Sequence, residues 1–351
     1  MSAGYKPVTW TASKLVYDAA LIAAVALYLY LFIHVAPHVA SVTLYNDEGM
    51  TKVQAFGTCA FLMFSFVLCI GPLARLDRRF LPLLYNRRHF GVVMALVAAM
   101  HAEYVIEWYF DFGHMSRWMQ LLLGNTSYAQ VVGFPFELFG MIALTILIVM
   151  AATSHDFWLR FLTPPLWKAI HMTGYLAYAC VVLHIALGHL QSAVNPMFLI
   201  VFVGGVTAVV SLHAAAALHE MRFDRGLPKD AAEAGWVEAG RVGEFTDARA
   251  RVIPLIEGER VAIFRHNGRL SAVSNACAHQ SGPLGEGRII DGCVTCPWHG
   301  YQYRLEDGCA PPPFTEKLAT YRLKLDGDRV LLDPRPNPPG TFVEPIAIGG
   351  S

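Results

Sequence analysis

The segment Cys277-Ala278-His279 is followed, after sixteen further residues, by Cys296-Pro297-Trp298-His299. Each segment offers one thiol and one imidazole from a short stretch of chain. Thiolate sulfur and imidazole nitrogen are the ligands that hold structural zinc, and the same pair of groups holds certain iron–sulfur clusters. Two such segments from two loops would complete a site with four ligands. The motif alone therefore predicts a metal centre and leaves its metal open between zinc and iron.

The residue pattern of the chain around this motif is typical of a small all-β domain. Short runs of alternating apolar and polar residues are separated by turns, which is typical of strands. The runs lie at 251–255, 260–265, 270–274, 289–290, 321–325 and 329–332. Asn267-Gly268 and Asp326-Gly327 are hairpin-turn signals between them. We expect the β domain at 236–334, preceded by a linker at 221–235 and followed by a tail at 335–351.

The residues of the two loops resemble those of the Rieske family. The resembling residues are Cys277-Ala278-His279-Gln280-Ser281-Gly282-Pro283-Leu284 and Cys296-Pro297-Trp298-His299-Gly300-Tyr301-Gln302-Tyr303. The resemblance covers about 236–334. It implies a [2Fe–2S] cluster with Cys277 and Cys296 on one iron and with His279 and His299 on the other.

The resemblance also indicates which type of Rieske protein this is. Rieske proteins of cytochrome bc complexes carry one extra cysteine in each loop, and the two form a disulfide. Gly282 and Trp298 stand at those places here. The match is therefore to the ferredoxin and oxygenase type, whose potential is generally lower. A cluster without that disulfide suits a reducing cytoplasm.

The first 220 residues differ sharply from the rest in their charge. The chain has 351 residues with 27 basic and 27 acidic side chains, of which 21 lie in 1–220 and 33 in 221–351. Six apolar stretches are about as long as the 20 residues needed to cross a bilayer core. They lie at 15–37, 53–73, 90–110, 134–153, 168–190 and 196–219. This predicts a multi-domain chain, with an all-α six-helix transmembrane bundle at 1–220 in contact with membrane lipid. It excludes a single soluble domain, a disordered chain and a nucleic-acid binder that relies on bulk positive charge.

The basic residues predict the orientation of the bundle. Cytoplasmic loops of membrane proteins carry an excess of Lys and Arg. One side of the bundle holds Lys6, Lys14, Arg75, Arg78, Arg79, Arg87, Arg88, Arg160 and Lys168, and the other only Lys52 and Arg117. We expect the N-terminus on the cytoplasmic side of a plasma or bacterial inner membrane. Six spans then return the β domain to the cytoplasm.

Eleven of the fourteen histidines precede residue 235, which is unusual for a lipid-embedded segment. His171 and His184 are thirteen residues apart, or roughly 20 Å along a helix, and His89 and His101 are roughly 18 Å apart. His89 and His171 should therefore share an inner depth, and His101 and His184 an outer one. Two histidines at one depth on neighbouring helices can hold a haem iron from both sides.

Other polar residues of the bundle have more ordinary interpretations. His213 could compete for the inner position, but we expect it to form a hydrogen bond between helices. A further set should lie at the outer side, as solvated helix ends or, alternatively, as a proton or metal site. That set is Glu103, Glu107, Asp111, His34, His38, His114 and His189.

The bundle resembles the ferric reductase-like transmembrane family over roughly 55–190. The resembling segments are Arg87-Arg88-His89-Phe90-Gly91 through His101, then Thr153-Ser154, and then Trp167-Lys168-Ala169-Ile170-His171 through Tyr175 and His184. The resemblance implies haem b held by the third and fifth helices, with His89, His101, His171 and His184 as ligands. His89 stands closer to His101 than is usual in the family. Two haems are expected, and one is the alternative.

These features predict a membrane-bound electron-transfer protein. We expect it to pass electrons between a cytoplasmic Rieske cluster and haem b, and on to an oxidised metal, a protein or a quinone at the membrane or outer face. A cytoplasmic reductase or ferredoxin would supply the electrons. The alternative is quinol-linked delivery from the haem through the Rieske domain to a cytoplasmic enzyme. A redox sensor is a further hypothesis. A Rieske oxygenase is disfavoured, because only 17 residues follow Pro334.

Overall fold

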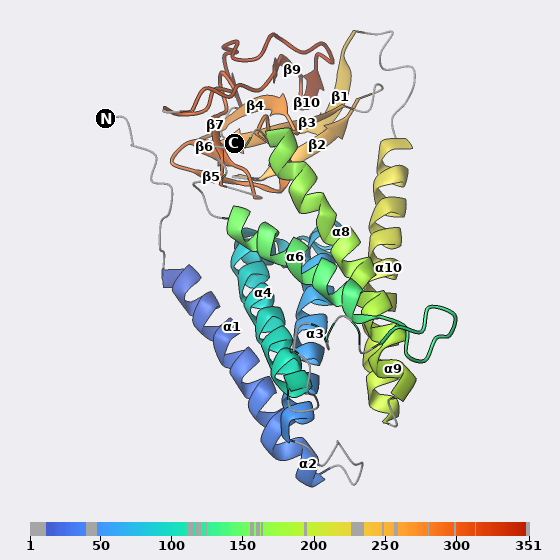
Figure 1. The fold of residues 1–351 in the computed structure, drawn as a ribbon. Coiled ribbons are helices and arrows are strands. Elements are labelled where there is room, and N and C mark those ends of the chain that lie inside the picture. Colours follow the sequence, from blue (N-terminus) through green and yellow to red (C-terminus); the bar gives the residue numbers. More distant parts are fainter. Residues whose placement is uncertain are drawn as a thin grey trace. The chain divides into compact units, whose positions relative to one another are not determined.

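The structure, a computed structural model, has a helical part and a β domain (Figure 1). The described residues are 12–39, 48–110, 116, 119, 121, 123, 125–154, 158, 162, 164–192, 195–225, 235–247, 249–255, 259–279, 281–297, 300–312 and 314–348.

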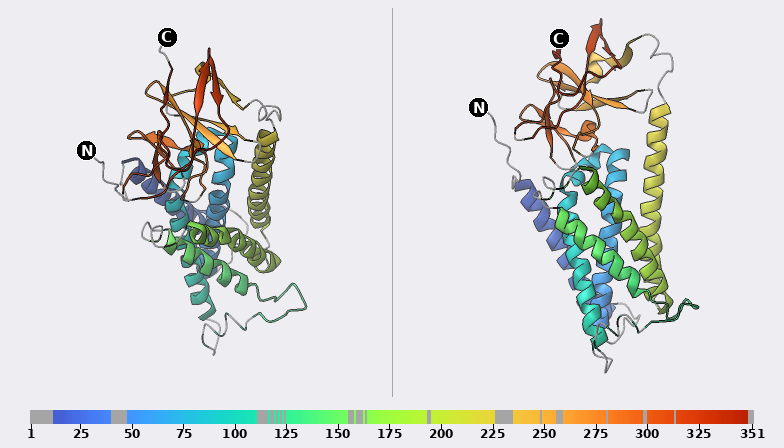
Figure 2. Two further views of the ribbon diagram at one scale, coloured as in Figure 1. Left: turned by 90° about the horizontal axis from the view of Figure 1, so that it is seen from above. Right: turned by 45° about the horizontal axis from the view of Figure 1, so that its top comes forward.

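The described helical part contains six long helices that lie side by side (Figures 1 and 2). Their bounds are α1 Ala12–Tyr30, α3 Glu48–Leu76, α4 Leu81–Phe110, α6 Glu137–Thr153, α8 Pro164–Leu187 and α10 Pro196–Arg225. A π-helical turn at Leu31–Val35 joins α1 to the short helix α2, Ala36–Val39, and the short helix α9, His189–Ser192, follows α8. All six predicted stretches are confirmed as helices.

Five of these helices are long and apolar enough to cross a membrane. The five segments are Lys14–His38, Glu48–Leu76, Asn86–Trp108, Leu166–Gln191 and Pro196–Arg222. The sixth, Glu137–Thr153, has 17 residues, which is near the lower limit for a span. Large apolar side chains such as Leu96, Ile200 and Val210 are exposed, as expected for a surface that faces lipid.

The start of α4 differs from the sequence prediction. The helix begins at Leu81, nine residues before the predicted stretch at 90–110, so Arg87, Arg88 and His89 lie well inside it. Pro82 is compatible with this start because the first turn of a helix needs no backbone donor there. In the preceding turn, the Asp77 carboxylate accepts a hydrogen bond of 2.9 Å from the backbone N–H of Arg79. Apolar patterning could not join these first turns to the span, because Asn86, Arg87 and Arg88 interrupt the apolar residues.

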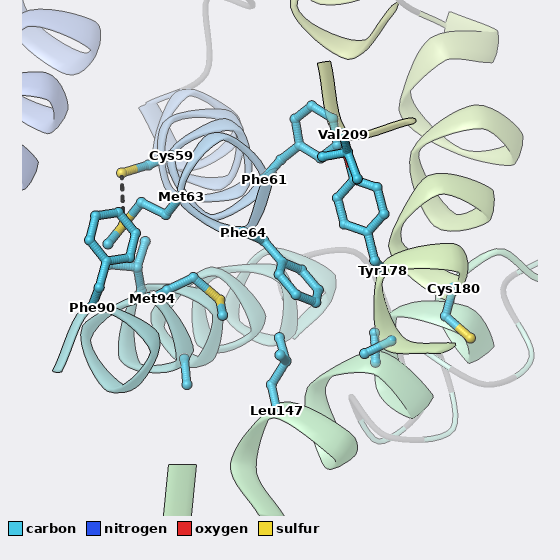
Figure 3. Close-up of a cluster of buried hydrophobic side chains, with 14 of the residues drawn as sticks. Cys59, Phe61, Met63, Phe64, Phe90, Met94, Leu147, Tyr178, Cys180 and Val209 are labelled. Carbon is cyan, nitrogen blue, oxygen red and sulfur yellow. Dashed lines mark hydrogen bonds between the residues drawn. The ribbon is translucent and has the colours of Figure 1, made fainter. Parts of the chain in front are cut away.

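Aromatic side chains join α3 to α8 in the middle of the bundle (Figure 3). The ring of Tyr178 stacks on Phe61 with a centroid distance of 6.2 Å and meets Phe64 edge-on at 5.2 Å. Its hydroxyl lies 2.9 Å from Ser65 Oγ. Lipid provides little hydrophobic drive between helices, so close packing and interhelical hydrogen bonds of this kind hold the bundle together.

The β domain consists of three small antiparallel sheets. The first has the order β1-β10-β9, the second β11-β4-β3-β2 with β8 beside β4, and the third β5-β6-β7. The strands are β1 Val237–Arg241, β2 Ala250–Pro254, β3 Arg260–His266, β4 Arg269–Ser274, β5 Arg288–Ile290, β6 Cys293–Thr295, β7 Gln302–Arg304, β8 Thr320–Tyr321, β9 Leu323–Asp326, β10 Arg329–Leu332 and β11 Ile346–Ala347.

The predicted strands and turns compare well with these elements. All six predicted runs contain strands, although the run at 321–325 is divided between β8 and β9. Asn267 and Gly268 both have positive φ, 51° and 69°, as a two-residue hairpin turn between β3 and β4 requires. Strands β1, β6, β7 and β11 were not predicted. β6, β7 and β11 are only two or three residues long, and alternation is not readable over so few positions.

The segment 335–351, expected to be a tail, is packed against the sheet as far as it is described. Ile346 pairs with Leu270 of β4, and the side chain of Ile348 is buried in the core. The Asn337 amide donates a hydrogen bond of 3.0 Å to the carbonyl of Thr320. Of the expected linker at 221–235, residues 221–225 belong to α10 and residues 226–234 lie outside the described residues.

Gly287, directly before the first strand of the third sheet, lies in closely packed surroundings. A Cβ at Gly287 would lie 2.4 Å from the carbonyl oxygen of Thr295, although the backbone there (φ −76°, ψ 179°) would accept alanine. We expect Gly287→Ala to destabilise the β domain by about 1–3 kcal/mol, because a backbone atom must move. Scanning calorimetry of the full-length protein in detergent measures this. Gly243→Ala, which would meet open space, is the control, and equal transition temperatures for the two variants would contradict the expectation.

Candidate functional site

The first motif loop of the β domain follows β4 and closes on its own backbone. The N–H of Ser281 donates to the carbonyl of Cys277 at 2.7 Å, and the N–H of Cys277 donates to the carbonyl of Gly282 at 2.9 Å. Ala276 and Pro283 form a bridge at the base of the loop. Ser281 has φ of 58°, a left-handed conformation that few residues other than glycine adopt. These backbone hydrogen bonds close the loop between Cys277 and Gly282.

The second motif loop, between β6 and β7, repeats the same hydrogen-bond pattern. The N–H of Gly300 donates to the carbonyl of Cys296 at 2.9 Å, and the N–H of Cys296 donates to the carbonyl of Tyr301 at 2.7 Å. Gly300 has φ of 73° at the position equivalent to Ser281. Cys277 and Cys296 therefore begin turns with the same hydrogen-bond pattern.

The potential ligands that the structure describes in these loops are buried inside the domain. Cys277 and Cys296 belong to the same buried cluster, and neither forms a disulfide. The His279 ring is 1% exposed and stacks on Tyr301 with a centroid distance of 4.0 Å. The fourth expected ligand, His299, lies outside the described residues. Within the described ranges no group of three or more His, Cys, Asp or Glu side chains forms a metal site.

Tyr303 of β7 lies beside the first loop and contacts two of its residues. Its hydroxyl is 3.3 Å from Cys277 Sγ and accepts a hydrogen bond of 3.2 Å from the N–H of His279. Burial, and then the negative charge of a Cys277 thiolate, raise the pKa of the Tyr303 phenol well above its ordinary value. The phenol therefore stays protonated, and it is the donor whenever Cys277 is a thiolate.

The donor set of the two loops fits a [2Fe–2S] cluster. Two buried thiols and a buried imidazole come from two loops, and a phenol can donate to one sulfur. Sulfur ligands must be deprotonated, and hydrogen bonds to them stabilise the charge that they then carry.

In the helical part, His101 of α4 and His184 of α8 are brought together. Their ring centroids are 6.3 Å apart and the ring planes are nearly perpendicular, at 82°. His101 Nδ1 lies 2.9 Å from the carbonyl oxygen of Val53, and His184 Nδ1 lies 3.0 Å from that of Phe136. A carbonyl can only accept, so each Nδ1 carries the proton and each Nε2 keeps its lone pair.

This pair of rings fits an axial ligand pair for haem iron. Imidazole–metal bonds are about 2 Å long, so two of them and two half-rings account for a centroid separation near 6 Å. A metal-bound histidine usually donates its second N–H to a carbonyl or carboxylate, as both rings do here. The positions of these two histidines along their helices also predict that they lie at one depth in the membrane.

Comparisons with known proteins match the two parts of the chain separately. The family described as "Ferric reductase like transmembrane component" matches residues 56–182, and the "Rieske [2Fe-2S] domain" matches residues 235–322. The ferredoxin component of the alkene monooxygenase system of Xanthobacter autotrophicus is 34% identical over 104 residues, which are 29% of this chain and 84% of that protein. The chain contains a ferric reductase-like transmembrane domain and a Rieske [2Fe-2S] domain.

A second curated ferredoxin and a solved ferredoxin are also similar to the Rieske domain. The anthranilate 1,2-dioxygenase ferredoxin subunit of Burkholderia cepacia is 32% identical over 100 residues, covering 27% of this chain and 89% of that protein. The solved ferredoxin of carbazole 1,9a-dioxygenase from Nocardioides aromaticivorans is 20% identical with a TM-score of 0.27, covering 28% of this chain and 98% of that chain. The Rieske domain supports a [2Fe–2S] cluster as cofactor, and the chain is a membrane protein with an electron-transfer role.

The two inner histidines of the ferric reductase-like domain contact other groups. His89 Nδ1 lies 2.8 Å and 3.0 Å from the two carboxylate oxygens of Asp18 on α1. His171 stacks on Trp167 with a centroid distance of 3.5 Å, and its Nδ1 lies 3.0 Å from the Trp167 carbonyl oxygen. Both rings thus have an acceptor at Nδ1, but the structure does not bring them together as it brings His101 and His184.

The remaining polar groups of this domain agree in part with expectation. The Tyr175 hydroxyl lies 3.2 Å from His213 Nε2, which confirms the predicted hydrogen bond between helices. Glu103 and Glu107 are exposed, and His34 lies in the π-helical turn. Asp111 and His114 lie outside the described residues.

Glu137, the first residue of α6, was missed by the sequence analysis. It is 5% exposed, and the Asn125 amide donates a hydrogen bond to its carboxylate. It directly follows Phe136, whose carbonyl bonds to His184. A lone acidic residue in the apolar stretch 134–153 is a costly feature in a membrane, and that signal could have found it.

Tyr303→Phe tests the contact between the phenol and Cys277. Removing a donor from a thiolate disfavours the extra electron of the reduced cluster, so the reduction potential should fall. For one electron, 59 mV corresponds to a tenfold change in the equilibrium constant, and we expect a fall of several tens of mV. An EPR-monitored redox titration measures it. Tyr321→Phe is the control, because its hydroxyl donates instead to Glu259 at 3.1 Å, and an unchanged potential in Tyr303→Phe would contradict the assigned contact.

Proposed function

We propose that the protein passes electrons between a [2Fe–2S] cluster in the Rieske domain and haem b in the ferric reductase-like domain. An oxidised metal, a protein or a quinone at the membrane or outer face would then accept them. When bound, each of these two groups supplies one-electron redox chemistry. The single observation that carries the proposal is the facing pair His101 and His184, each ring anchored to a backbone carbonyl, in the same chain as a Rieske domain.

The chain's own residues have the following proposed roles. Cys277, Cys296, His279 and His299 would hold the cluster, and Tyr303 would donate a hydrogen bond to the Cys277 sulfur. His101 and His184 would hold the outer haem. The carbonyls of Val53 and Phe136 would keep the proton on Nδ1, so that Nε2 binds the iron.

A second haem at the inner level is also part of the proposal. His89 and His171 would be its ligands, with Asp18 as the carboxylate that orients His89. Such a carboxylate–histidine pair in a span is costly and calls for a function. The contact of His89 Nδ1 with the Asp18 carboxylate supports the proposal, because a metal-bound histidine usually donates its second N–H to a carboxylate or a carbonyl.

The proposed orientation places the N-terminus and the Rieske domain in the cytoplasm. A cytoplasmic reductase or ferredoxin would then exchange electrons with the Rieske domain. The support is the excess of Lys and Arg on one side of the bundle, together with the absence of bc-type cysteines at Gly282 and Trp298. The proposed division of the chain is the bundle at 1–220, a linker at 221–235, the Rieske domain at 236–334 and a terminal segment at 335–351.

One observation favours a second candidate function with the opposite direction of flow. The similar proteins from Xanthobacter and Burkholderia are ferredoxin components of a monooxygenase and a dioxygenase system. The Rieske domain would then deliver electrons from quinol and haem to a cytoplasmic enzyme. A redox titration of cluster and haems decides between the two, because electrons flow spontaneously toward the higher potential.

His184→Ala tests the haem ligands. We expect the haem-to-protein ratio to fall by one, because the outer iron loses an axial ligand, while the Rieske EPR signal stays unchanged. Purification with haem and iron quantitation and EPR measures both. His213→Ala is the matched control, since its ring bonds to Tyr175 and Val209. An unchanged haem content in His184→Ala would show that the ligand assignment is wrong.

A reporter fused after Ser351 tests the orientation. We expect a fluorescent protein to be bright and alkaline phosphatase to be inactive at this position, because phosphatase folds only outside the cytoplasm. The phosphatase should become active when it is fused after Gly124, which belongs to the opposite side of the predicted bundle. The reverse pattern would overturn the orientation without affecting the cofactor assignments.

A further inference from the structure

His101 packs directly against a glycine of a neighbouring helix. A Cβ built on Gly57 of α3 would lie 2.9 Å from His101 Cε1 and 3.0 Å from His101 Nδ1, which is closer than ordinary contact. The carbonyl that meets this Nδ1 belongs to Val53, one helical turn before Gly57.

His184 packs in the same way against a glycine of a different helix. A Cβ on Gly140 of α6 would lie 2.9 Å from both Cε1 and Nδ1 of His184. The carbonyl that meets this Nδ1 belongs to Phe136, again four residues before the glycine. Within the described residues, Gly57 and Gly140 are the glycines whose Cβ would meet a histidine ring.

Helix geometry explains why the carbonyl and the glycine are four residues apart. Residues i and i+4 lie one above the other on a helix, and every Cα–Cβ bond tilts toward the N-terminus. A side chain at i+4 therefore overhangs the carbonyl of residue i. Without a Cβ at i+4, the second lone pair of that carbonyl is open to a donor from a neighbouring helix.

Phe136 contacts the segment that carries His184 in two ways. The Phe136 ring lies against Gly188, four residues after His184, where a Cβ would approach it to 2.3 Å. The rings of Phe136 and His184 are 5.3 Å apart. Phe136 therefore accepts the His184 hydrogen bond with its carbonyl and packs on the His184 helix with its ring.

We propose that Gly57 and Gly140 are positioning residues that hold His101 and His184 as an axial ligand pair. Each glycine and the carbonyl four residues before it form a seat that receives the Nδ1–Cε1 edge of one imidazole ring. The two seats, on α3 and α6, fix both the ring planes and the Nδ1 protons, so that Nε2 of each ring is the ligand atom. This inference rests on the proposed haem binding and adds the groups that orient the ligands.

The test compares alanine at the two seats in the full-length purified protein. Gly57→Ala and Gly140→Ala should each lower haem affinity by about 10–100-fold, the usual effect of disturbing a group that orients a metal ligand. Affinity is measured by haem transfer to a competing apoprotein. The anisotropy of the low-spin EPR signal should also change, because it reports the angle between the two imidazole planes, which is 82° here.

Two alanine variants on α10 separate positioning from packing. At Gly205 a Cβ would lie 2.7 Å from the Phe61 ring, so Gly205→Ala introduces a comparable clash away from the histidines, whereas at Gly204 it would meet open space. Both should keep wild-type haem affinity and EPR anisotropy. The melting temperature of each variant is measured alongside, and either seat variant alone suffices if the other does not fold.

The outcomes are distinct. Wild-type affinity and EPR signal in both seat variants, or an equal loss of haem in Gly205→Ala, would overturn the role of the seats while leaving haem binding intact. Wild-type protein that binds no haem would overturn the proposed function itself, and the seats with it. Loss that is confined to the seat variants, with a haem-loaded wild type, supports the inference.

Discussion

A polar ring inside a bilayer must find a partner, because no water is present to supply one. The arrangement of the helical part follows from this constraint. His101 and His184 meet backbone carbonyls of neighbouring helices, His89 meets the Asp18 carboxylate, and His213 meets the Tyr175 hydroxyl. Each of these contacts ties two segments of the bundle together. The interhelical bond between Ser65 and Tyr178 does the same in the aromatic core.

The Rieske domain satisfies its polar groups by a different route. Its two motif loops close by backbone hydrogen bonds of the same pattern, with a left-handed residue at Ser281 and at Gly300. These hydrogen bonds hold the described parts of the two loops in matching turns. The turns place the buried Cys277 and Cys296 in one core, as a site of fixed ligand geometry needs.

Joining the two parts in one chain changes how they can cooperate. Ferredoxin components such as that of Xanthobacter are about the size of this Rieske domain alone, and this chain spans 84% of that relative. A domain that is covalently joined to membrane helices encounters them at an effective concentration set by its linker, rather than by its abundance in solution. Under the proposed function, this would favour exchange of electrons with the attached bundle over exchange with other acceptors, without any additional binding surface.

The sequence by itself determined the six helices, because long apolar stretches have few alternatives, and the hairpin turn at Asn267-Gly268, because such turns need particular residues. The second hairpin turn lies at Gly327-Asp328, one residue after the predicted Asp326-Gly327. The sequence also determined the Cys and His motif, through its spacing. Only the tertiary structure decided which carbonyl each histidine meets, the pairing of His89 with Asp18, and the addition of Ile346 to the sheet at Leu270. Periodicity describes a residue within its own helix or strand. Which neighbouring backbone that residue contacts depends on how separate elements pack, and no local pattern records it.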